Sequence, residues 1–102
     1  MLFAIDYDGT YTGDPILFNV MMDLMLQRGH EYVLVTQRGI EHNEGIRKVI
    51  PENMTIINCP GVPKWMAVLQ AGLKVDVWIE DNPHALFNGY TYTGAIEDDP
   101  AE

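Results

Sequence analysis

The chain has 102 residues, of which 47% are hydrophobic and 21% are charged. This length fits one compact domain, and the composition excludes a disordered chain because it supplies enough apolar side chains for a core. Fifteen acidic and six basic residues give a formal charge of -9, which disfavours a general binder of nucleic acids or anionic membranes because such a surface repels phosphate groups.

The first part of the chain predicts a strand followed by a helix. Residues 2–5 are apolar and end at Asp6, a pattern typical of a buried strand whose end carries an acid. After a turn-rich stretch, Asp14 can cap a helix that has Pro15 at its first position. The apolar pattern of this helix continues through Leu26.

The alternation of strands and helices continues through the middle of the chain. Residues 32–35 predict a second buried strand, which Thr36 closes, and residues 40–50 are typical of a charged, partly amphipathic helix. Residues 54–57 predict a third strand. Pro63 then opens a short helix that carries a lysine in its first turn.

The last part of the chain predicts two more strands. Residues 75–79 are mainly apolar and end at Glu80 and Asp81. Residues 90–93 alternate tyrosine and threonine, which predicts an edge strand. Residues 97–102 are predicted to be a frayed acidic tail.

This alternation predicts an α/β fold of the Rossmann-like type, in which a mostly parallel sheet carries helices on both faces in three layers. We expect one domain over residues 1–96, followed by the tail at 97–102. Ligands of such sheets bind at the carboxyl ends of the strands. The predicted strand ends and the start of one helix bring together Asp6, Asp8, Thr36, Lys64, Glu80 and Asp81.

This ordered set of residues resembles four motifs of the haloacid dehalogenase superfamily. The matching segments are Ile-Asp-Tyr-Asp-Gly-Thr at 5–10, Val-Thr at 35–36, Lys64, and Ile-Glu-Asp at 79–81. Relatives often insert a cap domain after the first or the third strand, but only residues 9–14 and 58–63 are available there, too few for a cap. The resemblance therefore implies a capless core with an open cleft.

The resemblance implies phosphatase chemistry for four side chains. Asp6 would attack phosphorus and form an aspartyl-phosphate, which divides one difficult displacement into two easier steps. Asp8 would protonate the leaving oxygen and then deprotonate water, and crowding by neighbouring carboxylates would favour its neutral form. Thr36 would donate its hydroxyl to a phosphoryl oxygen, and Lys64 would offset the repulsion between Asp6 and the substrate.

The resemblance also implies a bound Mg²⁺. Asp81 would ligate the ion together with Asp6 and the carbonyl oxygen of Asp8, while Glu80 would act through a bound water. The Glu-Asp pair departs from the Asp-Asp or Gly-Asp of many relatives, so the role of Glu80 is less well defined. Arg38 follows Thr36 closely enough to reach a phosphate, but a surface arginine without a ligand is the commoner case, so we do not assign it to the site.

Several alternatives stay open from the sequence. The chain could be a binding module that keeps this fold without catalysis, or a phosphate-accepting signalling domain similar to a receiver, although the order of acids and lysine differs from that of a receiver. As an enzyme, it could act on polynucleotide 3'-phosphates, since residues 5–10 and 29–38 are similar to capless enzymes of that type. It could also act on a small nucleotide or sugar phosphate, which suits the negative charge of the chain better. The helical spacing of Met21, Met22 and Met25 indicates core packing or the face of a homo-oligomer.

The compartment follows from cysteine usage and the start of the chain. Cys59 is the only cysteine, so no intrachain disulfide forms, and no Cys/His spacing is typical of a zinc site. The chain reaches Asp6 too soon for a signal peptide, and no apolar run has the length of a membrane span. We therefore expect a cytoplasmic protein with a phosphorylated substrate as its partner and no membrane partner.

Overall fold

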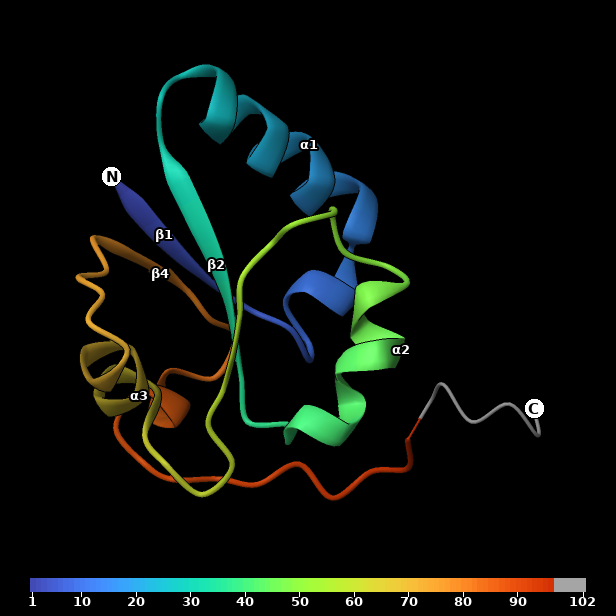
Figure 1. The fold of residues 1–102 in the computed structure, drawn as a ribbon, viewed down its shortest axis with the longest axis vertical. Helices are drawn as coiled ribbons and strands as arrows, with labels where there is room; N and C mark the ends of the chain where they lie inside the picture. Colours follow the sequence, from blue (N-terminus) through green and yellow to red (C-terminus); the bar gives the residue numbers. More distant parts are fainter. Residues whose placement is uncertain (97–102) are drawn as a thin grey trace.

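Four short strands form one parallel sheet in the order β3-β2-β1-β4 (Figure 1). The strands are β1 (Leu2–Asp6), β2 (Glu31–Thr36), β3 (Ile56–Asn58) and β4 (Val77–Ile79). The structure is a computed structural model and describes residues 1–96. All three strand pairs are parallel, which confirms the predicted α/β class. The acidic tail predicted at residues 97–102 lies outside the described residues.

Residues 1–96 contain three α-helices and three 3₁₀ helices, of which η3 follows the last strand and the others connect strands. They are η1 (Tyr11–Gly13), α1 (Pro15–Gln27), η2 (Ile40–His42), α2 (Asn43–Arg47), α3 (Lys64–Gln70) and η3 (Pro83–Leu86). The start of α1 agrees with the prediction, because Asp14 Oδ1 accepts a hydrogen bond from the backbone N–H of Leu17 at 3.1 Å. The single helix predicted over residues 40–50 is wrong in extent. Its place is taken by η2 and the five-residue α2, which contains Gly45, a poor helix former.

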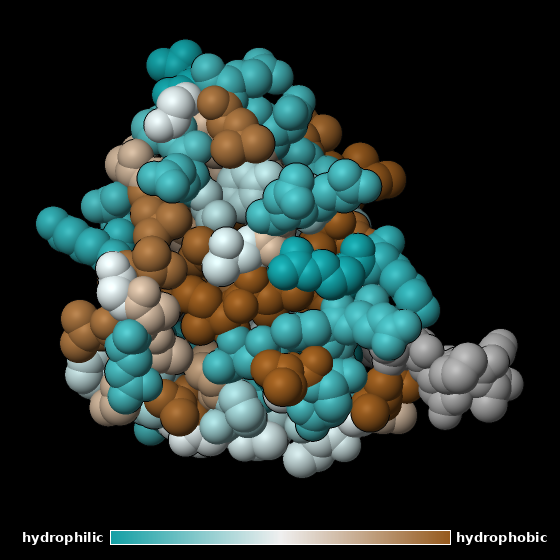
Figure 2. Space-filling model, in the orientation of Figure 1, coloured by the Kyte–Doolittle hydropathy of each residue, from teal (hydrophilic) through white to brown (hydrophobic). Residues whose placement is uncertain are grey.

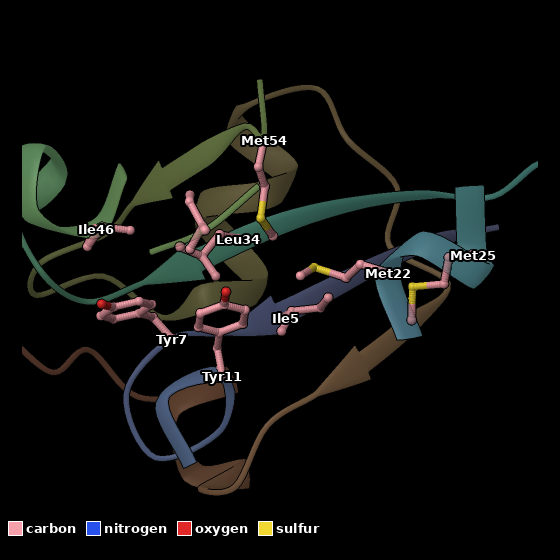
Figure 3. Packing of buried hydrophobic residues seen from close by; sticks show 9 residues of the cluster. Ile5, Tyr7, Tyr11, Met22, Met25, Leu34, Ile46 and Met54 are labelled. Carbon is pink, nitrogen blue, oxygen red and sulfur yellow. The ribbon is translucent and has the colours of Figure 1, made fainter. Parts of the chain in front are cut away.

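Helices cover both faces of the sheet, which gives three layers. Side chains alternate along β1, so Ile5 packs in one hydrophobic cluster with Met22 of α1 and Ile46 of α2, as Figure 3 shows. Ala4 belongs to a second cluster, which includes Val68 of α3. Each fully buried apolar side chain contributes about 1.5–3 kcal/mol of transfer free energy. The predicted core role of Met22 and Met25 is confirmed by their burial.

The order of the strands decides where a ligand site can form. The chain moves from β1 through β2 to the edge strand β3, and α3 then carries it across the opposite face to β4, on the other side of β1. The chain therefore leaves β1 toward one side of the sheet and later returns to its other side. In open α/β sheets a crevice forms where the direction changes in this way, beyond the carboxyl ends of the strands. Asp6 ends β1 at this point.

The edge strand predicted at residues 90–93 is wrong. Residues 88–92 form an irregular segment, which we call the strap. Its backbone bonds to two loops instead of a strand edge: the carbonyl oxygen of Tyr90 accepts from the N–H of Gly61 at 2.7 Å, and the N–H of Tyr92 donates to the carbonyl oxygen of Gln37 at 3.2 Å. In Figure 1, the chain after η3 runs along the carboxyl-end edge of the sheet, from α3 toward α2.

Apolar surface also lies outside the core. Figure 2, in the orientation of Figure 1, shows apolar residues among hydrophilic ones on the surface of the molecule. Helix α1 contributes Ile16 and Val20, which are 79% and 63% exposed. The homo-oligomer suggested by the sequence stays a prediction. Within residues 1–96, no helix combines the length and the apolar composition needed to cross a membrane.

Candidate active site

A cavity of about 260 Å³ lies at the carboxyl ends of β1 and β4. Its lining contains four carboxylates and one ammonium group, contributed by Asp6, Asp8, Lys64, Glu80 and Asp81, and three residues of the strap, Tyr90, Thr91 and Tyr92. Five of the six side chains that the sequence placed in the site therefore meet in one cavity. These residues come from segments up to 75 positions apart, because parallel strands end at the same edge of the sheet.

Three carboxylates form a cluster that could hold a metal ion. Asp6, Glu80 and Asp81 each offer an oxygen atom, and these atoms lie within 4.8 Å of one another. Carboxylate oxygens are the ligands that hard divalent cations prefer in proteins. The chemistry of this donor set therefore fits a cation such as Mg²⁺.

Lys64 lies between two of these carboxylates. It is the first residue of α3 and only 2% exposed. Its Nζ donates to Asp6 Oδ1 at 2.6 Å and to Glu80 Oε1 at 2.5 Å. A buried ammonium requires such partners, because burial of an unpaired charge is costly. The helix start thus fixes a positive charge beside Asp6.

Thr10 is a further site residue that the sequence reading did not single out. Its buried Oγ1 lies 3.0 Å from both Asp6 Oδ2 and Asp81 Oδ1, so its single hydrogen can bond to one of them at a time, and the oxygen accepts from the N–H of Asp81. The only signal in the sequence was its place at the end of the first motif. Thr10 therefore links the carboxyl ends of β1 and β4.

Gly9 allows Asp81 to approach the first motif. Its φ is +80°, and a Cβ built there would lie 2.5 Å from Asp81 Oδ2. A side chain at this position would be strained and would also collide with the carboxylate. The glycine is therefore required by the position of Asp81.

The carboxylates of the cluster titrate differently. Burial raises the pKa of Asp6 to about 8 against the attraction of Lys64, and a hydrogen bond with Asp81 and the charge of Glu80 raise it further. The pKa of Asp81 is lowered, chiefly by its hydrogen bond with Asp6. Burial alone would lower the pKa of Lys64, but the charges and hydrogen bonds of Asp6 and Glu80 outweigh it, so that pKa is raised. In the metal-free cluster, burial therefore favours the protonated form of Asp6.

Asp8 faces a different cation from Asp6. Arg38 Nε donates to Asp8 Oδ2 at 2.9 Å, and Nη2 donates to Oδ1 at 2.6 Å. This paired geometry is that of a guanidinium bound to a carboxylate. The sequence reading expected neighbouring carboxylates to favour a neutral Asp8, but the nearest charge is that of Arg38. The arginine that the sequence reading left outside the site is thus the partner of Asp8.

Aromatic rings hold Arg38 in place. Its guanidinium carbon lies 3.8 Å from the ring centroid of Tyr92 and 5.2 Å from that of Tyr7. His42 packs edge-on against Tyr92, with 5.1 Å between the ring centroids. Arg38 is only 4% exposed, whereas the side chain of Asp8 is 38% exposed. The strap therefore contributes to the position of Arg38 through Tyr92.

Thr36 does not line the cavity. It is 1% exposed, and its Oγ1 accepts a hydrogen bond from the backbone N–H of Arg38 at 3.1 Å. Its carbonyl oxygen accepts from the N–H of Cys59 at 2.8 Å. The side chain thus supports the turn after β2. The phosphate-binding role that the resemblance implies for Thr36 stays a prediction.

No family model matches the chain, and no curated protein or solved structure matches it. The description of the site therefore depends on its own geometry. That geometry defines a parallel α/β fold with an acidic cluster that could hold a metal ion at the carboxyl ends of β1 and β4.

Proposed function

We propose that the chain is a magnesium-dependent phosphomonoester hydrolase of the haloacid dehalogenase type, without a cap domain, and that Asp6 is its nucleophile. The observation that carries this proposal is the position of Asp6, which lies in the cavity beside a buried ammonium and two further carboxylates. A carboxylate can attack a phosphate only where positive charge offsets their repulsion. The four motif segments and their order support the same proposal.

Three residues would hold the metal ion. Asp6, Glu80 and Asp81 offer the oxygen atoms, and Thr10 orients two of them. When bound, Mg²⁺ would offset the negative charge of the phosphate and orient it. Lys64 would supply a further positive charge beside Asp6.

The first step transfers the phosphoryl group to the protein. Asp6 would act as the carboxylate, a form that a bound cation would favour by displacing the Asp6 proton to water. One of its oxygens forms a bond to phosphorus while the bond between phosphorus and the leaving oxygen breaks. The leaving oxygen then takes up a proton from Asp8. In the second step, water attacks the same phosphorus, the bond to Asp6 breaks, and inorganic phosphate is released.

Asp8 would donate a proton in the first step and accept a proton in the second. Asp8, which accepts hydrogen bonds from Arg38, would take a proton from the attacking water in the second step. The proton gained in this way is the one that the leaving oxygen of the next substrate receives. Asp8 lines the cavity with 38% of its side chain exposed, whereas Arg38 is only 4% exposed.

The decisive experiment is hydrolysis of p-nitrophenyl phosphate with and without Mg²⁺. Asp6→Asn should lower kcat at least about 10³-fold, because an amide cannot form the intermediate. The control, Asp23→Asn, changes an exposed acid on α1 and should keep wild-type turnover. Asp8→Asn should slow turnover strongly and accumulate the aspartyl-phosphate, which acid-quench labelling detects. Wild-type turnover by Asp6→Asn would contradict the proposal.

A non-catalytic binding module is the second candidate function. It is favoured by the position of Thr36, whose hydroxyl lies outside the cavity lining and accepts the N–H of Arg38. A module of this kind would bind a divalent cation through Asp6, Glu80 and Asp81 without turnover. Calorimetric binding of Mg²⁺ with no hydrolysis of aryl phosphates under any divalent metal would support it over the enzyme.

A further inference from the structure

We propose that the strap restricts this site to small phosphomonoesters whose leaving group is uncharged, such as a sugar or a nucleoside. Leaving groups that carry further phosphates, including polynucleotide ends, would be excluded. This inference rests on the proposed phosphatase function and names its substrate class. It depends on three features of the strap and the cavity: a fixed wall, limited volume and the distribution of charge.

The strap is a fixed wall of the cavity. Tyr90, Thr91 and Tyr92 line the same space as the carboxylates. Besides the backbone bonds of Tyr90 and Tyr92, the carbonyl oxygen of Asn88 accepts from Gln37 Nε2 at 3.2 Å. The ring of Tyr92 packs on Arg38, so the wall is joined to the partner of Asp8.

A close backbone contact fixes the strap further. A Cβ built on Gly89 would lie 2.2 Å from the carbonyl oxygen of Gly61. The two backbones therefore touch without a side chain between them. This contact places the wall next to the loop that precedes Lys64.

The volume of the cavity limits the leaving group. The cavity measures about 260 Å³, below the range of roughly 300–1,000 Å³ that is typical of pockets for drug-sized ligands. Such a volume favours a small phosphomonoester over a longer chain. The open cleft expected from the absence of a cap is thus narrowed by the strap.

The charge of the lining disfavours a second phosphate. Four carboxylates line the cavity, and Lys64 is the one Lys or Arg among the described lining residues. Arg38 is engaged by Asp8. Even with a divalent cation held by the other carboxylates, the lining has no surplus positive charge. A phosphate on the leaving group would face carboxylates, which is electrostatically unfavourable.

The wall offers groups that suit an uncharged leaving group. Tyr90, an aromatic residue, is 44% exposed and lines the cavity. Gln37, Asn82 and Thr91 line the same space and carry polar side chains that can bond to hydroxyl groups. An aromatic face beside a few polar groups is the usual composition of a small-molecule site.

The first test compares substrates with the wild-type protein and Mg²⁺. A nucleoside 3'-monophosphate should have a kcat/KM at least about tenfold higher than that of the nucleoside 3',5'-bisphosphate or of an oligonucleotide with a 3'-phosphate. Equal values, or a preference for the oligonucleotide, would overturn the inference. Hydrolysis of p-nitrophenyl phosphate serves as the reference, because its absence would defeat the proposed function itself.

The second test changes the wall. Tyr90→Ala should raise KM for the nucleoside monophosphate by about tenfold and reduce its advantage over the oligonucleotide. The control is Phe87→Ala, which removes a 69% exposed aromatic ring that does not line the cavity. If both variants hydrolyse p-nitrophenyl phosphate and have the same substrate ratios, the strap does not select the substrate.

A binding measurement gives the same comparison without turnover. Calorimetry with Asp6→Asn and MgCl₂ should show tighter binding of the nucleoside monophosphate than of the bisphosphate. Equal or reversed affinities would overturn the inference even if the wild-type protein is an active phosphatase. The binding measurement thus tests the preference for an uncharged leaving group, and the hydrolysis of p-nitrophenyl phosphate tests the proposed catalysis, so that either can be contradicted without the other.

Discussion

Two groups of ion pairs lie at the carboxyl end of β1, one around Lys64 and one between Arg38 and Asp8, and they differ in burial and in partners. Lys64 is enclosed with Asp6 and Glu80, and all three side chains are at most 8% exposed. Arg38 is equally buried, but its partner Asp8 is 38% exposed and the guanidinium lies between aromatic rings. The first group has two carboxylates for one ammonium, and burial raises the pKa of one of them, Asp6. The second group has one carboxylate for one guanidinium. The difference teaches that neighbouring acids in one motif can have separate tasks.

The largest expected effect is the loss of the enclosed ammonium. Lys64→Met should lower the free energy of unfolding by about 3–5 kcal/mol, because it leaves buried carboxylates without their partner. Urea titration of the metal-free protein measures this change. Lys74→Met alters an exposed lysine and should change stability by less than about 0.5 kcal/mol. Equal losses in the two variants would show that burial of Lys64 has no special role.

The pH dependence of stability should come from Asp6, the buried partner of Lys64. The pKa of Asp6 is raised from 3.8 to about 8 in the folded protein, so between these values the folded state holds a proton that the unfolded state releases. The free energy of unfolding of the metal-free protein should therefore fall as pH rises from about 4 to about 8, by at most about 1.4 kcal/mol per pH unit.

Asp6→Asn should remove this slope, because the amide does not titrate. Lys64 does not contribute in the same window, since its pKa is raised above 10.5. Urea titrations at several pH values measure both proteins. A wild-type stability that rises over the window would contradict the assignment of the proton to Asp6.

A smaller effect is expected from the contact between Gly9 and Asp81. Gly9→Ala should cost about 1–3 kcal/mol, because φ is positive there and the new Cβ collides with a carboxylate. The affinity for Mg²⁺ should also fall, as the displaced carboxylate is part of the cluster. Gly13→Ala is the matched control, since no atom lies within 4 Å of its Cβ position. Thermal unfolding with and without Mg²⁺ separates the two effects.

The smallest effect is expected at the second pair. Tyr92→Leu should lower stability by about 0.5–2 kcal/mol, because it removes the ring beneath the guanidinium of Arg38. Tyr92→Phe keeps the ring and should stay close to the wild type. Denaturant unfolding of both variants measures the difference. A loss in Tyr92→Phe as large as in Tyr92→Leu would show that the hydroxyl, rather than the ring, matters.

Local signals predicted the elements that local chemistry determines. Asp14 and Pro15 marked the start of α1, and the apolar run before Asp6 marked β1. The alternation of tyrosine and threonine at residues 90–93 was misleading because it is typical of a strand. Tertiary contacts, rather than this local pattern, determine the backbone conformation there. Its hydrogen bonds go to Gln37 and Gly61, which no local pattern reveals.

The site was predictable where strand ends alone decide position. Asp6, Glu80 and Asp81 follow from the parallel sheet and its order. The pairing of Asp8 with Arg38 could not be predicted, since it depends on which way two side chains turn at the ends of neighbouring strands. Thr36 illustrates the same limit, because a hydroxyl at a strand end can face a ligand or the next turn.

The backbone contact between Gly61 and Gly89 has a consequence for how substitutions could change the cavity. No side chain sets the spacing of the two backbones there, so any larger residue at position 89 would push residues 90–92 outward. The mouth of the cavity would widen and the ring of Tyr92 would move away from Arg38, while Lys64 would keep its contacts with Asp6 and Glu80. One substitution beside the wall of the cavity would therefore change the size of the ligand that fits, without a change in the acidic cluster.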